Sequence, residues 1–445
     1  MRVSSPTRAL GFGIVAGTIA LVAPLLIGTV LMPSTASAAD PQAPGDFRGY
    51  GFDACVAPSQ TVMDSWNLRS PFTAIGIYIS GNSRYCGDKY QPNLSKSWVE
   101  KNASNGWRFI PIHVGYQSPC FKNNSSSRVQ KKRMSSTIST ARSQAASDAA
   151  ETIAALKKFG FGSGSVSYLD LEWYSRTTSC DNAVLEFIDV WTEKLHAAGY
   201  KSGVYSSGSA GIAALDAAKK AGRSISYPDH VWIAWTNKKA DTDGGPYLRD
   251  TVWANHQRIH QYHNGVNVSY GGHTVNIDKN FLDVGKGSVP TTDPRPCGVA
   301  MSFSSYPRLD RGDTGSRVSA LQCLLKERGY SVSVNGTFGS STSKAIDAFR
   351  KSLGWGPTGH TTNPTWTALL SAGSKPRVLK RGSVGEAVWR LQRALVPAGM
   401  SVTVNGVYDS KTVSAVRAYR SANGLTSYET TESSVWALLQ RGRPG

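Results

Sequence analysis

Two acidic residues separated by a single residue, Asp170 and Glu172, give the clearest catalytic signal in the sequence. They end the segment 167–172, whose alternation is typical of a β-strand with Tyr168, Asp170 and Glu172 on one face. Neighbouring carboxylates repel each other, which raises the pKa of one and keeps it protonated as a general acid near neutral pH. A solvated strand end or a cation site has the same pattern, so the pair alone does not decide.

Two further aspartates fall at comparable places in other predicted strands. Asp53 ends the strand 47–53, and Asp278 lies in the strand 275–282. The first and last strands of a closed barrel are neighbours, so we expect all four carboxylates at one mouth. Aromatic side chains predicted at the ends of three other strands could stack on sugar rings, or could equally pack inside the barrel; they are Tyr205, Trp235 and Tyr262.

The elements that would position these side chains lie in residues 45–284, where short apolar strands alternate with helical stretches. This pattern predicts an α/β domain, and eight strands fit a TIM-like (β/α)8 barrel. Helices are expected at 141–159 and from Asp181, a suitable N-cap, to Gly199. The basic, Ser-rich segment 122–133 reads as a surface loop, either simply solvated or contacting a polyanion. The predicted strands are 47–53, 72–79, 107–114, 165–172, 199–205, 230–236, 256–262 and 275–282.

All six cysteines follow residue 38, and an even number in an exported chain favours three disulfides. Four of them come shortly after predicted strands one to four, so we expect them on neighbouring loops, joined as Cys55–Cys86 and Cys120–Cys180. The remaining pair, Cys297 and Cys323, could brace the region that follows. No two have the spacing of a zinc-thiolate site.

The first 38 residues are expected to direct export. Arg2 and Arg8 precede an apolar run at 10–32, and the small residues at 36–38 suit cleavage before Ala39. An uncleaved membrane anchor is the alternative, because the apolar run is long enough to span a bilayer. With cleavage, we expect a secreted protein without stable membrane insertion.

The chain of 445 residues has a net charge of +19, which favours a polyanionic environment: nucleic acid, an anionic membrane or an acidic wall polymer. Export makes nucleic acid a poor candidate. Residues 291–445 carry a net +11 and residues 39–290 a net +6, so the excess lies mainly in the C-terminal part. Between these parts, 285–306 is rich in proline and turn-forming residues and is expected to be a linker.

An internal repeat with an offset of 70 residues fills the C-terminal third, predicting modules at 307–371 and 377–441. Each copy contains R-G-x-x-G-x-x-V-x-x-L-Q, starting at Arg311 and at Arg381, followed by N-G-x-[FY] and a late tryptophan. The apolar spacing predicts three helices per copy. The motif resembles the peptidoglycan-binding type 1 family, which implies affinity for cell-wall glycopeptide; a helical spacer is the alternative.

Residues 45–284 resemble the glycoside-hydrolase-like domain of unknown function 1906 and, more distantly, the glycoside hydrolase family 25 muramidases. The resemblance rests on the segments 51–55, 74–79 and 203–207, on Asp170-x-Glu172, and on His260-Gln261-Tyr262 through Ile277-Asp278. It implies that Glu172 donates a proton to the glycosidic oxygen and that Asp170 tunes Glu172 or stabilises the transition state. Asp53 and Asp278 would orient substrate or water, and the further substrate-binding candidates are Tyr78, Tyr168, Tyr205, Trp235, Gln261 and Tyr262.

We therefore expect a secreted, wall-associated hydrolase of peptidoglycan glycan strands, needing no cofactor or metal. One alternative is a wall-binding protein whose barrel keeps a pocket without turnover. The other is a zinc amidase that uses His256, His260 and His263, but His263 would lie on the opposite strand face from the other two. The retaining or inverting mechanism and the oligomeric state stay open.

Overall fold

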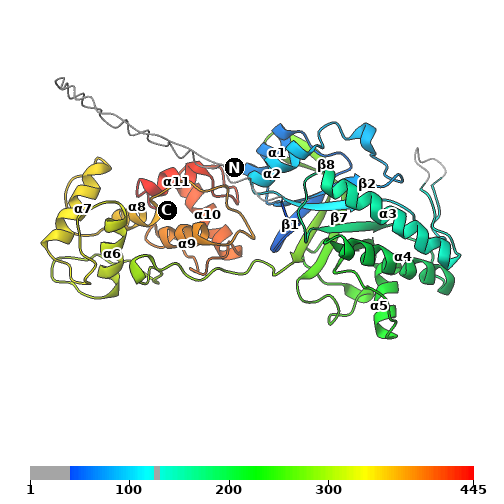
Figure 1. Ribbon diagram of the computed structural model, residues 1–445. Helices are drawn as coiled ribbons and strands as arrows, with labels where there is room; N and C mark the ends of the chain where they lie inside the picture. Colours follow the sequence, from blue (N-terminus) through cyan, green and yellow to red (C-terminus); the bar gives the residue numbers. More distant parts are fainter. Residues whose placement is uncertain (1–40, 125–130) are drawn as a thin grey trace, which may run out of the picture. The chain divides into compact units, whose positions relative to one another are not determined.

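The computed structural model of the chain describes residues 41–124 and 131–445 (Figure 1). Eight strands form a closed barrel in sequence order, and each predicted strand is present. Within the described residues, no helix is both long and apolar enough to cross a membrane. The predicted signal peptide, 1–38, lies outside the described residues. The strands are β1 (Phe47–Asp53), β2 (Ala74–Ser80), β3 (Arg108–His113), β4 (Val166–Leu171), β5 (Lys201–Ser207), β6 (His230–Ala234), β7 (Gln257–Tyr270) and β8 (His273–Val284).

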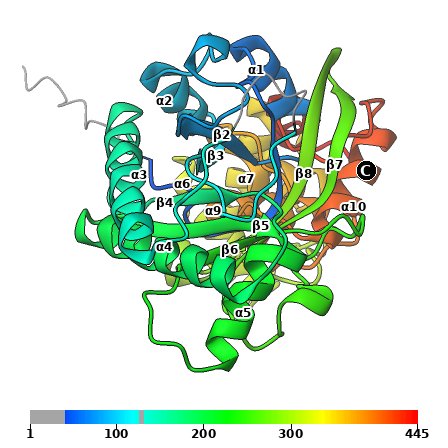
Figure 2. The same ribbon diagram turned by 90° about the vertical axis from the view of Figure 1, so that its right-hand side faces the viewer.

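The last strand departs from the all-parallel pattern of a (β/α)8 barrel. Strands β1 to β7 pair in parallel, whereas β8 is antiparallel to both β7 and β1. The cause is the two-residue turn Gly271-Gly272, where both residues have positive φ (57° and 82°). Such a turn joins only antiparallel strands and leaves no room for a crossover helix. Figure 2 shows the resulting β7–β8 hairpin extending beyond the barrel.

Helices surround the outside of the strands, as Figure 2 shows. Helix α4 starts earlier than predicted: Thr177, not Asp181, is its N-cap and accepts a hydrogen bond from the Cys180 amide at 3.2 Å. Asp181 instead accepts from the Tyr174 hydroxyl at 2.9 Å. The helices are α1 (Gln60–Arg69), α2 (Lys96–Ser104), α3 (Ile138–Lys158), α4 (Thr178–Ala197) and α5 (Ala213–Lys220), with short helical turns η1 (Asp88–Tyr90), η2 (Gly208–Ile212), η3 (Gly245–Tyr247) and η4 (Pro296–Gly298).

The barrel has two apolar layers because strand side chains alternate between its outside and its interior. Phe52, Ile75 and Val204 face outward and pack among helical side chains such as Trp66 and Trp191. A smaller cluster fills the interior and includes Phe47, Ile112, Tyr168, Trp232 and Leu282. The interior is therefore packed below the acidic end of the barrel.

The three predicted disulfides are confirmed. Cys55–Cys86 and Cys120–Cys180 connect the segments that follow the first four strands, and Cys297–Cys323 connects the linker to the first repeat. Cys180 lies in the first turn of α4 rather than in a loop. The second disulfide therefore ties the segment after β3 to a helix beside the Asp170–Glu172 pair.

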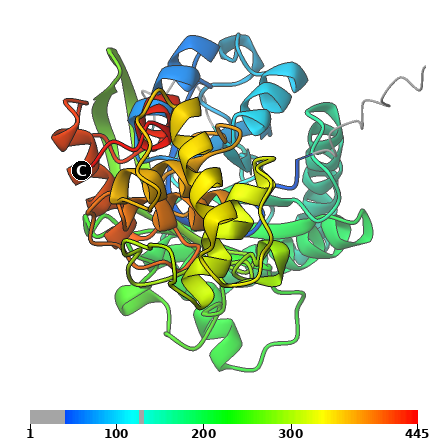
Figure 3. The same ribbon diagram turned by 90° about the vertical axis from the view of Figure 1, so that its left-hand side faces the viewer.

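Each C-terminal repeat contains the three expected helices (Figure 3). One buried glutamine organises each copy: Gln322 donates to Asn335 Oδ1 at 2.9 Å and accepts from the Gly336 amide at 2.8 Å. Gln392 makes the same bonds with Asn405 and Gly406 in the second copy. The shared L-Q and N-G residues thus fix one turn in both copies. The helices are α6 (Ser316–Glu327), α7 (Ser340–Ser352), α8 (Asn363–Ser371), α9 (Glu386–Leu395), α10 (Ser410–Ala422) and α11 (Ser433–Gln440).

Candidate active site

The four predicted carboxylates lie at one end of the barrel. Asp53 is the last residue of β1, Asp170 is the second-last residue of β4, and Glu172 follows that strand directly. Asp278 reaches the same end because antiparallel β8 places it directly opposite Asp53. The four carboxylates therefore converge as predicted, but Asp278 does so from an antiparallel strand and not from the end of a parallel one.

Asp53 is buried and held by three side chains. Its carboxylate accepts hydrogen bonds from Asn280 Nδ2 at 2.6 Å, from the Tyr78 hydroxyl at 3.2 Å and from Gln261 Nε2 at 3.3 Å. Burial, together with the charge of Asp278, raises the pKa of Asp53 to about 7, although the hydrogen bonds oppose this shift. Asp53 is thus a fixed group poised to exchange a proton near neutral pH.

The pKa of Asp170 is raised further than that of Asp53. Burial raises its pKa to about 8, with further contributions from Glu172 and Asp53, while Lys131 acts in the opposite direction. Its Oδ1 is buried and has no hydrogen-bond partner among the described residues. Asp170 also lines a cavity of about 100 Å³ together with Glu172, Tyr78 and Tyr85. The cavity therefore contains a carboxyl group that stays protonated at neutral pH.

Glu172 has a different environment. Its side chain is 40% exposed, and its carboxylate forms an ion pair with the ammonium group of Lys131. Its backbone amide donates to Gln117 Oε1 at 2.8 Å. The two members of the acidic pair are thus distinguished: Asp170 is buried and protonated, and Glu172 is ion-paired beside it.

Asp278 is half-buried and accepts a hydrogen bond from the Gly265 amide at 2.5 Å. Burial raises its pKa, and the charge of Glu172 contributes to the same shift. The Gly265 amide comes from the hairpin that β7 and β8 form. Asp278 is therefore anchored to this hairpin while it faces the other carboxylates.

The predicted substrate-binding residues have different surroundings. Tyr78 lines the cavity and bonds to Asp53. The Tyr205 hydroxyl donates to Gln261 Oε1 at 3.0 Å, which orients the Gln261 amide toward Asp53. Trp235 is partly exposed and stacks on His260, whereas Tyr262 is only 8% exposed. Tyr78 is therefore the predicted aromatic that directly adjoins the acidic cavity.

Tyr168 does not fit its predicted role. It is fully buried in the barrel interior, and its hydroxyl lies 2.9 Å from His230 Nδ1. It also packs edge-on against Trp232. Strand alternation correctly places Tyr168 on the same strand face as Asp170. However, Tyr168 comes two positions earlier on the strand and lies within the packed core, out of reach of substrate.

Sequence reasoning missed three residues of the site. Asn280 binds Asp53, and it lies two positions after Asp278 on the same strand face, so alternation could have identified it. Gln117 and Lys131 lie in irregular segments, where no periodicity marks them. Segment 122–133 was expected to be a surface loop; residues 125–130 of it lie outside the described residues, and Lys132 and Arg133 are exposed. The Lys131 side chain differs, because it is only 17% exposed and contacts Glu172.

Two of the three histidines proposed for a zinc amidase, His256 and His260, have other partners. His256 Nδ1 lies 2.5 Å from Asp283 Oδ1. His260 is buried, with its ring nitrogens 3.0 Å and 2.8 Å from the carbonyl oxygens of Asp241 and Trp235. A carbonyl oxygen lies in front of each ring nitrogen of this buried side chain, so neither nitrogen is open to a metal ion. The described residues therefore do not favour the zinc alternative.

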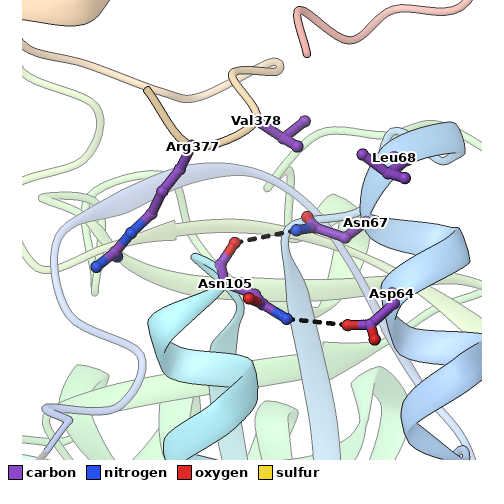
Figure 4. A pocket seen from close by; sticks show the side chains of 6 residues that line it. All are labelled: Asp64, Asn67, Leu68, Asn105, Arg377 and Val378. Atoms are coloured by element: carbon purple, nitrogen blue, oxygen red, sulfur yellow. Dashed lines mark hydrogen bonds between the residues drawn. The ribbon is translucent and has the colours of Figure 1, made fainter. Parts of the chain in front are cut away.

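A second pocket lies beside α1 and α2 (Figure 4). There Asn67 Nδ2 donates to the Asn105 carbonyl at 3.0 Å, and Asn105 Nδ2 donates to Asp64 Oδ1 at 2.9 Å. Asp64 is the one carboxylate among the residues that line this pocket. It lacks a second acidic group for acid–base chemistry, so the acidic cavity of β4 is the better candidate active site.

Comparison with known proteins gives two family matches and several distant structures. The crystal structure of the Mycobacterium tuberculosis Tat-secreted protein Rv2525c in complex with L-tartrate is 14% identical, with a TM-score of 0.36, and covers 53% of this chain and 95% of that chain. The catalytic domain of endolysin Ply40 from Listeria monocytogenes bacteriophage P40 is 16% identical, with a TM-score of 0.32, and covers 53% and 93%. The modular autolysin LytC from Streptococcus pneumoniae is 14% identical, with a TM-score of 0.33, and covers 52% and 46%.

No curated protein matches the sequence significantly. Residues 64–282 match the family described as Rv2525c-like, glycoside hydrolase-like domain. Residues 314–369 match the putative peptidoglycan binding domain. These matched ranges lie within the barrel and the first helical repeat. The chain therefore carries an Rv2525c-like glycoside hydrolase-like domain followed by a peptidoglycan-binding domain.

Proposed function

We propose that this protein hydrolyses the glycan strands of peptidoglycan, as a secreted, wall-associated enzyme of the lysozyme type. The observation that supports this most directly is the cavity shared by Asp170 and Glu172. Glycoside hydrolysis typically uses two carboxyl groups that flank the scissile bond, one of them protonated and the other ionised. Asp170 and Glu172 differ in burial and in partners in the way that this chemistry requires.

The remaining carboxylates support the pair. Asp53 and Asp278 face each other at the same barrel end, and we assign them the orientation of substrate or of the attacking water. An oxocarbenium-like transition state carries positive charge, so a group of carboxylates around it is electrostatically favourable. Tyr78 and Tyr85 line the same cavity and offer aromatic faces for sugar rings.

Binding to the wall is assigned to the helical repeats. A peptidoglycan-binding domain in the same chain brings the barrel to an insoluble polymer and raises the local concentration of glycosidic bonds. The net charge of +11 on residues 291–445 favours the same anionic surface. This location also agrees with the export signal expected at the N-terminus.

The decisive experiment incubates purified peptidoglycan with the wild-type protein, with Asp170→Asn and with Glu172→Gln, and measures new reducing ends and new free amines. We expect reducing ends from the wild-type protein and a loss of at least about 100-fold in each variant, the usual scale for removing an acid–base group. Glu193→Gln is the matched control, because Glu193 is exposed on α4 away from the cavity.

The other outcomes separate the alternatives. Free amines that disappear on chelation would point to an amidase and contradict the glycosidase. Retention on sedimented peptidoglycan without reducing ends or amines would support a non-catalytic wall-binding protein. Loss of activity in the Glu193→Gln control would mean that the substitutions act on folding rather than on chemistry.

A further inference from the structure

Lys131 makes the closest contact with the candidate pair. Its ammonium group forms an ion pair with Glu172, and the lysine side chain is only 17% exposed. It also lies 6.0 Å from the centroid of the Phe121 ring. A surface lysine normally keeps its ammonium group in water, so this position requires support from the surrounding backbone.

That support comes first from Asn123. Its side chain accepts a hydrogen bond from the Lys131 amide at 2.8 Å and donates to the Lys131 carbonyl at 3.0 Å. The next amide, that of Lys132, donates to Ser83 Oγ at 3.1 Å. The backbone that carries Lys131 is therefore bonded on both sides of its Cα atom.

Gln117 connects this backbone to the acidic pair. Its own backbone bonds to Lys132 and Met134, while its side chain donates to the Asp170 carbonyl at 2.8 Å and accepts from the Glu172 amide at 2.8 Å. One residue thus fixes both the lysine segment and the end of β4. The Cys120–Cys180 disulfide ties the same region to α4.

The charges around the pair explain why a lysine is needed. Asp170 is influenced by Glu172 and Asp53, and Glu172 in turn acts on Asp278. The hydroxyls of Tyr78 and Tyr205 face the same group from β2 and β5. Lys131 is the one basic residue among those described as lining the cavity. Without it, the described residues that line the cavity would offer these acidic groups no cation.

We propose that Lys131 is the positioning residue of the acidic pair: its ammonium group holds the Glu172 side chain in place beside Asp170 at the end of β4. This rests on the proposed function and deepens it, because it adds a basic residue to the acidic pair and assigns the role of proton donor to Asp170, whose pKa burial raises. The resemblance to the muramidases implied the opposite roles. The difference follows from a contact that the acidic motif itself does not contain.

The test follows the protonation of Asp170 in the full chain labelled with ¹³C at the side-chain carboxyl groups of Asp and Glu. Asp170→Asn and Glu172→Gln identify the two signals. In Lys131→Met, loss of the nearby cation should raise the pKa of Asp170 further, by about one unit or a tenfold change in proton affinity. Lys131→Arg should restore the wild-type titration. Lys132→Met, an exposed neighbouring lysine, is the matched control and should leave it unchanged.

Activity gives a second readout. If Asp170 donates the proton, the rate should fall as the pH rises through the pKa of Asp170. Lys131→Met should shift this fall in rate to higher pH, and Lys131→Arg should leave it at the wild-type pH. An Asp170 titration that is the same in the wild type and in Lys131→Met would overturn the proposal. So would a protonated Glu172 beside an ionised Asp170 in the wild type at about pH 6. If the wild type releases no reducing ends, the proposed function fails, whereas the titration still decides the role of Lys131.

Discussion

Asp53 and Asp278 lie directly opposite each other in the register of the antiparallel pair β1–β8. Side chains in such directly opposed positions point to the same face and come close, so two ionised carboxylates there would repel each other. Burial and this neighbour together raise the pKa of Asp53 to about 7. The antiparallel direction of β8 therefore has a chemical consequence, because it adds the charge of Asp278 to the effect of burial on the pKa of Asp53.

Asn280 should be important for both stability and this protonation. Its amide donates to Asp53 at 2.6 Å, and its Oδ1 accepts from Trp232 Nε1 at 2.9 Å. Asn280→Ala leaves buried polar groups without these partners, so we expect a loss of about 1–3 kcal/mol in the free energy of unfolding, measured by chemical denaturation. The pKa of Asp53 should also rise, since this hydrogen bond lowers it. Asn276→Ala, on the exposed hairpin, should change the free energy of unfolding by less than about 0.5 kcal/mol; equal losses in the two variants would contradict this account.

The two buried aspartates predict how stability depends on pH. In the unfolded chain an aspartate has a pKa of about 3.9, whereas in the folded protein Asp53 and Asp170 have pKa values of about 7 and about 8. Their contribution to stability is fully present below about pH 4 and is lost as the pH rises toward about 8, because only the unfolded state ionises in that range.

Thermal unfolding of the wild type and of Asp53→Asn between about pH 4 and about pH 8 measures this contribution. The variant removes the part that belongs to Asp53, so its advantage over the wild type should grow as the pH rises. Asp250→Asn, an exposed substitution of the same kind, serves as the control. Parallel curves for the wild type and Asp53→Asn would refute the prediction.

The sequence predicts the barrel well because its strands are apolar and alternating, and because their spacing leaves room for helices. The antiparallel direction of β8 was not predicted, although the dipeptide Gly271-Gly272 is typical of a tight hairpin turn. The count of eight strands favoured an all-parallel barrel instead. Asp170 and Glu172 could be identified because they belong to a strand. The partner that distinguishes them, Lys131, is 41 positions before Glu172 in an irregular segment. Its role depends on tertiary contacts made by Gln117 and Asn123, which no local pattern encodes.

The Cys120–Cys180 disulfide should stabilise the region around Lys131. It joins residues 60 positions apart, and closing a loop of this size contributes about 2–4 kcal/mol. We expect a double Cys→Ser variant at these positions to lose that amount in chemical denaturation. Amide exchange at Met134, which bonds to Gln117, should accelerate as well. The equivalent double variant at Cys55 and Cys86 should leave exchange at Met134 slow; acceleration there to the same degree would show that the effect is global.

Trp173 should bind glycan without contributing much to stability. It follows Glu172 directly and is 51% exposed, and it is the one tryptophan among the large apolar residues described as exposed. An exposed indole beside the candidate acidic pair offers a flat face for a sugar ring, and we expect such an aromatic contact to contribute about 0.5–1.5 kcal/mol. Trp173→Ala should therefore raise KM on peptidoglycan fragments about 2- to 12-fold, with kcat and the unfolding midpoint nearly unchanged. Ile138→Ala, an exposed apolar substitution at the start of α3, controls for general loss of surface hydrophobicity and should leave KM unchanged. A fall in kcat with constant KM would instead place Trp173 in the support of Glu172, because losing an interaction made only in the transition state lowers kcat without affecting ground-state binding.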